Sequence, residues 1–177
     1  MNPPLSIERV KSSELSSTLA AEIEQLCDAA YATGTARFFK SLGPGDHLLG
    51  RSNGILVSHL MWITRWLQPE GSRPLQTAYV EMVATLPVEQ RKGYASTLLA
   101  QFPSLVEDFE LAALCPATEG LYLRLGWCFW RRPLSARKAG TIVETPGERV
   151  MTLTLPNTPP LDLDGRLSVE WRDGEVW

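Results

Sequence analysis

The feature that most constrains the fold lies at residues 75–108, where a strand pattern, a short loop and a helix pattern follow one another. Residues 75–86 are mostly apolar and β-prone, which predicts one long buried strand. After Pro87, apolar side chains recur at helical spacing from about Arg91 to Asp108. Pro103 lies inside this helix pattern and is expected to kink or shorten the helix. A buried strand that feeds directly into a helix is typical of α/β proteins.

The rest of the chain supplies further strands and helices for this α/β fold. The patterns predict strands at residues 7–10, 47–50, 55–67, 110–115, 127–130 and 148–155, and helices at residues 13–32, 35–42 and 117–125. A Ser52-Asn53-Gly54 turn indicates a hairpin between two of the strands. Residues 131–147 are expected to form a loop, and residues 156–177 a polar tail. A chain of 177 residues suits one domain, 1–177.

Composition narrows the class of protein. Hydrophobic residues make up 44% and charged residues 21% of the chain, as in a globular protein without membrane spans. The net charge of −3 is opposite in sign to that of most nucleic-acid-binding domains, so no nucleic-acid partner is expected. Three widely spaced cysteines and two histidines favour a reducing compartment, the cytoplasm, and give poor support to a metal site.

The loop after the long strand carries the chemistry. An exposed helix N-terminus binds phosphate groups because its N–H groups are unpaired and the helix dipole is positive there. Small residues allow a pyrophosphate to approach the main chain, and basic residues add full charges. This loop and the first helical turn contain Gln90, Arg91, Lys92, Gly93, Tyr94 and Ala95.

The run from Gln90 to Ala95 resembles the Q/R-x-x-G-x-G/A signature of the GCN5-related N-acetyltransferase (GNAT) superfamily. Residues 121–127, Leu-Tyr-Leu-Arg-Leu-Gly-Trp, are similar to the LYxxxGF/W segment of the same family. The resemblance implies a GNAT fold, with helices flanking a mixed, mostly antiparallel sheet. It also implies that the sheet is splayed in the middle, between the strand that ends near Leu86 and the strand at residues 110–115.

The same resemblance implies roles for particular residues. Acetyl-CoA would be the co-substrate, with its pantetheine chain held by main-chain groups beside Met82, Val83 and Ala84. Glu81 would take a proton from the attacking amine through water. Tyr122 would protonate the thiolate that leaves, because a phenol can act as a general acid.

Within the superfamily, the chain resembles the aminoglycoside 2′-N-acetyltransferases. The similar stretches are Tyr79–Glu81, Leu121–Trp127 and Glu170–Trp177, the last of which resembles a terminal DWRxGDVW. Aminoglycosides are polycations, so carboxylates should line their site. The groups expected to bind the substrate are Glu81, Glu148, Asp173, Glu175 and the α-carboxylate of Trp177. The tail at residues 156–177 would complete the acceptor site, and the activity would confer antibiotic resistance.

One departure from that group keeps alternatives open. The group carries acidic residues in the loop after the first long helix, whereas residues 32–39 of this chain contain no acid and include Arg37. One alternative is therefore an acetyltransferase for another amine, such as a polyamine, an amino sugar or a peptide N-terminus. A second is a non-catalytic acyl-CoA-binding module. The sequence leaves a homodimer open and does not define the amine position.

Overall fold

The structure is a computed structural model that describes residues 4–177, and it divides into two compact units. The first unit comprises the described part of Met1–Ile63 together with Val80–Phe102, and the second comprises Thr64–Tyr79 and Pro103–Trp177. Strands β3 (Ile55–Pro69) and β4 (Leu75–Thr85) contribute residues to both units. No helix formed by residues 4–177 is long and apolar enough to cross a membrane.

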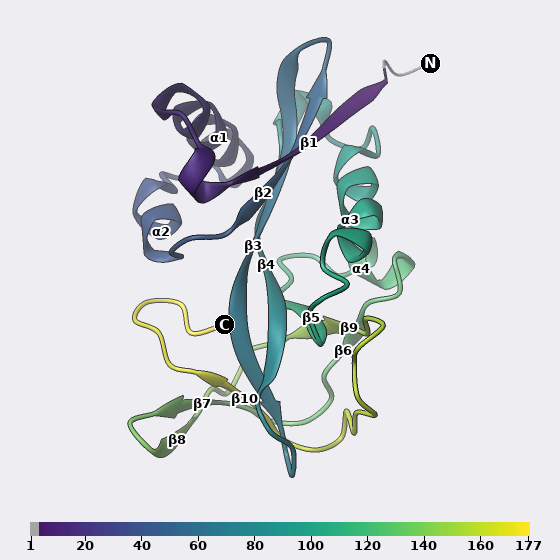
Figure 1. Cartoon of the computed structure of the whole chain (residues 1–177). Helices are drawn as coiled ribbons and strands as arrows, with labels where there is room; N and C mark the ends of the chain where they lie inside the picture. Colours follow the sequence, from purple (N-terminus) through teal and green to yellow (C-terminus); the bar gives the residue numbers. More distant parts are fainter. Residues whose placement is uncertain (1–3) are drawn as a thin grey trace. The chain divides into compact units, whose positions relative to one another are not determined.

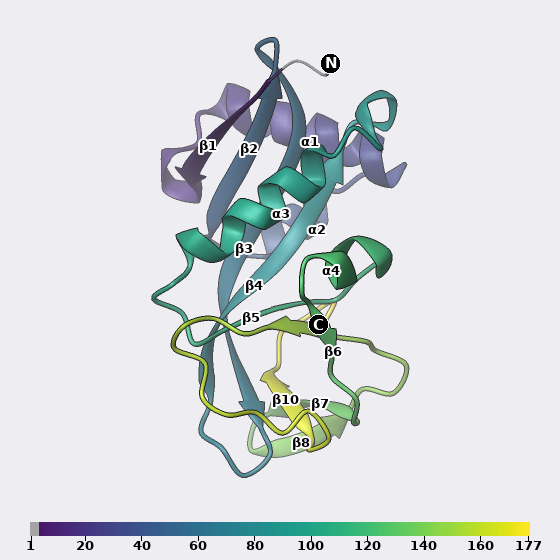
Figure 2. The ribbon, with the colours of Figure 1, turned by 90° about the vertical axis from the view of Figure 1, so that its right-hand side faces the viewer.

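The first unit contains the amino-terminal strands and three helices. Strand β2 (Asp46–Ser52) pairs antiparallel with β1 (Leu5–Lys11) on one side and with β3 on the other. Helices α1 (Ser17–Tyr31) and α2 (Ala36–Ser41) cover one face of these strands, and α3 (Tyr94–Leu105) covers the opposite face (Figures 1 and 2). Two 3-10 turns, Ser12–Glu14 and Pro87–Glu89, complete this unit.

Local sequence signals account for much of this unit. The side chain of Ser16 accepts a hydrogen bond from the Leu19 N–H, so Ser16 caps α1. The turn between β2 and β3 has positive φ at Asn53 and Gly54, as a tight hairpin requires. In the core, the ring of Phe102 from α3 packs edge-on against Trp62, with 5.4 Å between ring centroids.

The second unit is a mixed sheet. Its strand order is β6-β9-β5-β4-β3-β10-β7-β8, and its short helix is α4 (Gly120–Arg124) (Figure 2). The strands not yet introduced are β5 (Leu111–Leu114), β6 (Cys128–Phe129), β7 (Leu134–Lys138), β8 (Thr141–Glu144), β9 (Met151–Leu153) and β10 (Leu167–Glu170). Only the β4–β5 and β7–β10 pairs of the described strands are parallel. The predicted α/β fold with a mixed, mostly antiparallel sheet is confirmed.

One prediction about the second unit was wrong, and one of its strands was not predicted. Residues 131–147 were predicted to be a loop, but they form the β7–β8 hairpin around a turn with positive φ at Ala139 and Gly140. The tail at residues 156–177 contains β10, which pairs with β3 and β7. Strand β8 is mostly exposed, so it lacks the alternation of apolar residues by which a half-buried strand is recognised.

Candidate functional site

The predicted phosphate loop follows β4 directly and is held by main-chain and side-chain hydrogen bonds. The Leu86 N–H donates to the Val57 carbonyl at 3.0 Å, and the Gln90 side-chain amide donates to the Thr85 carbonyl at 3.3 Å. Arg91 and Gly93 have φ of 63° and 88°. Because these left-handed residues interrupt helical geometry, α3 begins at Tyr94 and not at the predicted Arg91.

The first turn of α3 has the features of an anion site. The Gly93 carbonyl accepts from both the N–H and the hydroxyl of Thr97, at 2.9 and 3.0 Å. A Cβ added at Gly93 would meet no described atom within 4 Å, so the space beside this residue is open. Tyr94 is buried, whereas Ala95 is half-buried. The first turn of α3 therefore follows a glycine with open space beside it, and its main-chain N–H groups have no partner within the helix.

The two basic residues of the loop differ in their surroundings. The Lys92 ammonium forms an ion pair with Glu89 at 2.8 Å, and this contact raises the pKa of Lys92. Arg91 is exposed. The sequence predicted two full positive charges here, but Glu89 offsets part of the field of Lys92.

Three successive carbonyl groups at the end of β4 accept hydrogen bonds from side chains. His59 Nδ1 lies 3.0 Å from the Met82 oxygen, the Tyr31 hydroxyl donates to Val83 at 3.0 Å, and Ser58 Oγ donates to Ala84 at 3.1 Å. Met82 itself has φ of 53°, in the left-handed region that few non-glycine residues adopt. The segment predicted to hold pantetheine is thus a local irregularity of the strand, stabilised by side chains.

The two candidate catalytic residues lie in different units. Glu81 is a half-buried residue of β4 in the first unit, directly before Met82. Tyr122 is a buried residue of α4 in the second unit, packed edge-on against Trp127 at 6.1 Å. Desolvation by burial raises the pKa of Tyr122 to about 12, so its phenol is protonated at neutral pH.

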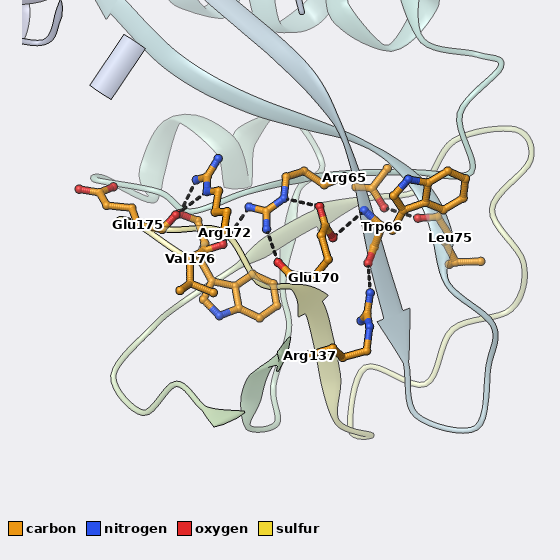
Figure 3. A network of polar contacts seen from close by, with 10 residues as sticks. Arg65, Trp66, Leu75, Arg137, Glu170, Arg172, Glu175 and Val176 are labelled. Atoms are coloured by element: carbon orange, nitrogen blue, oxygen red, sulfur yellow. Dashed lines mark hydrogen bonds and ion pairs between the residues drawn. The ribbon is translucent and has the colours of Figure 1, made fainter. Parts of the chain in front are cut away.

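The C-terminal segment is anchored within the second unit by a buried guanidinium group (Figure 3). Arg65 is 2% exposed and donates to the Glu170 carboxylate, the Glu170 carbonyl and the Val176 carbonyl, each at 2.8 Å. Its guanidinium carbon lies 5.3 Å from the centroid of the Tyr79 ring. The Trp177 indole donates to Thr145 Oγ1 at 2.8 Å. These contacts show that residues 170–177 are docked and do not form a solvated end.

The acidic groups predicted to bind the substrate have different environments in this segment. Asp173 and Glu175 are exposed, and Asp173 accepts a hydrogen bond from the Trp171 indole at 3.2 Å. Trp177 is buried, and Arg172 donates to its main-chain oxygen at 3.1 Å. Arg172 also donates to the main-chain oxygen of Glu175. Glu148, also exposed, lies 3.8 Å from the Cys115 thiol.

The two acids nearest to the acid-free segment at residues 32–39 have structural partners. Asp28 accepts hydrogen bonds from the N–H and hydroxyl of Thr35, both at 2.6 Å, and these bonds lower the pKa of Asp28. Asp46 forms an ion pair with Arg9 at 2.9 Å. Both carboxylates are therefore engaged by neighbouring groups of the protein.

The site residues predicted from sequence fall into two groups. The first unit holds Glu81, Met82–Ala84 and Gln90–Ala95, and the second holds Tyr122, Glu148, Asp173, Glu175 and Trp177. Sequence reasoning did not find the residues that hold these segments in place. His59, Tyr31 and Ser58 bind the strand carbonyls, and Arg65 and Arg172 bind the tail.

Comparison with known proteins shows the family to which the chain belongs. The family described as the acetyltransferase (GNAT) domain matches residues 7–129. The chain therefore belongs to the GNAT acetyltransferase family. The matched region includes the phosphate loop, the strand irregularity at Met82, and Tyr122.

Two individual proteins show which members of the family this chain is similar to. An aminoglycoside 2′-N-acetyltransferase of Mycolicibacterium fortuitum is 29% identical over 140 residues, which cover 75% of this chain and 71% of the relative. The crystal structure of Eis1 from Mycobacterium abscessus has a TM-score of 0.60 and 20% identity, covering 70% of this chain. The match spans only 31% of Eis1, so the matched part of this chain corresponds to about a third of that protein.

A GNAT family acetyltransferase from Brucella melitensis matches nearly the whole chain. It has a TM-score of 0.56 and 18% identity, and the match covers 92% of this chain and 94% of that protein. That structure was solved in complex with acetyl-CoA. With the family established, acetyl-CoA fits as the co-substrate of this chain.

Proposed function

We propose that this protein transfers an acetyl group from acetyl-CoA to an amino group of an aminoglycoside, the 2′ amine, and thereby confers antibiotic resistance. The observation that carries this proposal is the 29% identity to an aminoglycoside 2′-N-acetyltransferase over three quarters of the chain. Residues 1–177 would act as one acetyltransferase domain, with the tail at 156–177 completing the acceptor site.

In this proposal, the cofactor binds mainly through the main chain. The pyrophosphate lies at the start of α3, where Gln90–Ala95 provide N–H groups, an open glycine position and the exposed Arg91. The pantetheine chain lies along Met82–Ala84, whose carbonyls are held by side chains. Both segments belong to the first unit.

The proposed reaction is a direct transfer in a ternary complex. The substrate amine attacks the thioester carbonyl, an N–C bond forms, the C–S bond breaks, and the products are an amide and CoA. Glu81 takes the proton that the amine loses, through a water molecule. Tyr122 stabilises the leaving thiolate and supplies its proton.

The raised pKa of Tyr122 refines this role. A phenol with a pKa of about 12 is a weaker acid than an alkyl thiol, whose pKa is about 8.5. Tyr122 would therefore donate a hydrogen bond to the sulfur as negative charge develops, and the phenolate left when its proton passes to the thiolate would take a proton from solvent.

Carboxylates supply the proposed affinity for a polycation. Glu81, Glu148, Asp173, Glu175 and the main-chain oxygen of Trp177 are the candidate groups. The side chains of Asp173 and Glu175 are exposed, and the bonds that Arg65 and Arg172 make in this region go to main-chain oxygens and to the Glu170 carboxylate.

A second candidate function has its own supporting observation. Residues 32–39 lack acids, and Asp28 and Asp46 have structural partners. This favours an acetyltransferase for an amine other than an aminoglycoside, such as a polyamine, an amino sugar or a peptide N-terminus.

Measuring the release of free CoA thiol distinguishes these candidate functions. The protein is mixed with acetyl-CoA and, in turn, an aminoglycoside, a polyamine, an amino sugar and a peptide with a free N-terminus. The proposal predicts the highest kcat/KM for the aminoglycoside. A higher kcat/KM for another amine would support the second candidate. Binding of acetyl-CoA without thiol release for any amine would support a non-catalytic acyl-CoA-binding module.

A further inference from the structure

Two buried histidines form a hydrogen-bonded chain that ends at the irregular residue of β4. His47 and His59 are both 0% exposed. His47 Nδ1 lies 3.0 Å from His59 Nε2, and the second nitrogen of His47 lies 3.0 Å from the Ser12 hydroxyl. The second nitrogen of His59 lies 3.0 Å from the Met82 oxygen. The chain therefore runs from Ser12 through both rings to Met82.

The direction in which each proton is donated along this hydrogen-bonded chain follows from the groups at its two ends. A carbonyl oxygen can only accept, so the bond to Met82 requires the proton of His59 on Nδ1. His59 Nε2 must then accept from His47 Nδ1, which leaves His47 Nε2 to accept from the Ser12 hydroxyl. Ser12 Oγ also accepts from the Gly45 N–H at 3.0 Å, which leaves its proton for His47. Each histidine thus has one tautomer that satisfies both of its neighbours.

Both rings are neutral, as this pattern requires. Burial lowers the pKa of His47 to about 4 and that of His59 to about 3. The Cys27 thiol lies 3.8 Å from His59 Nδ1, and burial raises the pKa of that thiol to about 12. The thiol is therefore also neutral and places no charge beside the chain.

Met82 needs such support because of its backbone conformation. A non-glycine residue in the left-handed region costs free energy, and it persists only where surrounding contacts stabilise it. The neighbouring carbonyls of Val83 and Ala84 are bound by hydroxyl groups, but the carbonyl of the left-handed residue itself is bound by an imidazole with a fixed proton.

We propose that His59 is a positioning residue for acetyl-CoA: its Nδ1 proton holds the left-handed conformation of Met82, and His47 and Ser12 hold that proton on Nδ1. This inference rests on the proposed function, because it assumes that Met82–Ala84 contact pantetheine. His59 itself touches neither the cofactor nor the reacting atoms in this account.

Two conservative variants separate the two hydrogen bonds of the ring. In His59→Asn, the side-chain amide can occupy the place of Nδ1, so the donor to Met82 is kept and the link to His47 is lost. In His59→Gln, the amide reaches the place of Nε2, so the link to His47 is kept and the donor to Met82 is lost. Cys27→Ala is the matched control, because it removes another buried contact of the same ring.

The first readout is acetyl-CoA binding by calorimetry with no acceptor present, together with the free energy of unfolding. Cys27→Ala and His59→Asn should bind acetyl-CoA within about threefold of the wild type, whereas His59→Gln should bind at least about tenfold more weakly. If Cys27→Ala is less stable than the wild type but binds acetyl-CoA equally well, destabilisation alone does not lower acetyl-CoA affinity. Equal acetyl-CoA affinity for folded His59→Gln and His59→Asn would overturn the inference.

The second readout uses the wild-type chain and needs no variant. Nitrogen-15 NMR of the histidine rings reports which nitrogen carries the proton. The inference requires protonated Nδ1 on both His47 and His59, and a proton on Nε2 of His59 would overturn it. If the wild type binds no acetyl-CoA while the rings show the expected tautomers, the proposed function fails, and the cofactor role of His59 fails with it.

Discussion

Residues 82–95 and residues 170–177 are held in place in different ways, although both carry candidate site groups. In the first region, side chains fix the main chain: His59, Tyr31 and Ser58 bind carbonyl groups, and Gly93 leaves an open helix end. In the second region, Arg65 and Arg172 bind main-chain oxygens and leave acidic side chains exposed.

We relate this difference to the two ligands of the proposed reaction, the cofactor and the acceptor. A ligand of constant structure, such as CoA, can be bound by main-chain groups whose positions depend little on side-chain identity. An acceptor that varies between relatives must be selected by side chains. We therefore propose that the first region binds the cofactor and that the second bears on the substrate. Three predictions concern binding and catalysis, in order of decreasing effect, and a fourth concerns stability.

The largest effect is expected at Gly93. Gly93→Asp places a negative charge beside the proposed pyrophosphate position and should weaken acetyl-CoA binding by at least about a hundredfold, or about 2.7 kcal/mol. Gly93→Asn is the matched control, because it has nearly the same size and also tolerates the φ of 88°. Calorimetry should show a loss below about tenfold for the Asn variant. Equal losses for Asp and Asn would indicate that strain, and not charge, governs this position.

The next largest effect is expected at Tyr122. Tyr122→Phe removes the proposed donor to the leaving sulfur and should lower kcat by about ten- to a hundredfold. The KM values for both substrates should change little, because the donor acts on charge that develops in the transition state. The measurement is steady-state kinetics with a pre-steady-state check that chemistry limits the rate. An unchanged kcat under that condition would remove Tyr122 from the mechanism.

A smaller effect is expected in the tail. The double variant Asp173→Asn/Glu175→Gln removes two exposed charges and should raise the KM for an aminoglycoside by about tenfold, or about 1.4 kcal/mol. The acetyl-CoA KM should not change. The aminoglycoside KM of the wild type should also rise with salt, because ions screen exposed charges.

Charge neutralisation is a cleaner test of the tail than truncation. Deleting residues 173–177 would also remove the Val176 carbonyl that accepts from the buried Arg65, and so would destabilise the second unit. The control is Glu107→Gln/Asp108→Asn, which removes two exposed carboxylates after α3. A similar rise in KM for this control would show that net charge, and not the tail, attracts the substrate.

The last prediction concerns stability as a function of pH and not binding or catalysis. His47 and His59 have native pKa values of about 4 and about 3, below the ordinary value of about 6.5. The unfolded chain therefore binds more protons than the native chain below pH 6.5, and stability falls as the pH falls. From pH 6.5 to 5.5 the loss should be about 1 kcal/mol for each histidine.

Denaturant unfolding across this range measures the slope. His59→Asn leaves one titrating histidine and should reduce the slope by about half. The carboxylates with lowered pKa values, such as Glu22 and Glu110, contribute only at lower pH. A flat profile between pH 6.5 and 5.5 would contradict the assignment of two buried neutral rings.

The first region could largely be predicted from sequence because its signals are local. The strand predicted at residues 75–86 matches β4, Leu75–Thr85, and the helix pattern with Pro103 matches an α3 that ends at Leu105. The helix start was misplaced because the conformations of Arg91 and Gly93 depend on the loop and not on apolar spacing.

The missed features depend on contacts between residues distant in sequence. His59 binds Met82 and His47, and these partners cannot be inferred from spacing. Arg65 lies in an apolar strand pattern, and only the folded tail explains its burial. Strand β10 is short and acquires its structure by pairing with β3 and β7. Local pattern cannot show such pairings.

The most direct test of the central claim uses two aminoglycosides that differ only at the 2′ position, one with an amine and one with a hydroxyl group. Each is incubated with the protein and acetyl-CoA, and the products are analysed by mass spectrometry and NMR. The account predicts transfer of one acetyl group to the 2′ amine and no transfer to the 2′-hydroxyl analogue. Acetylation of both compounds at another amine would contradict the 2′ assignment, and acetylation of neither would contradict the assignment to aminoglycosides.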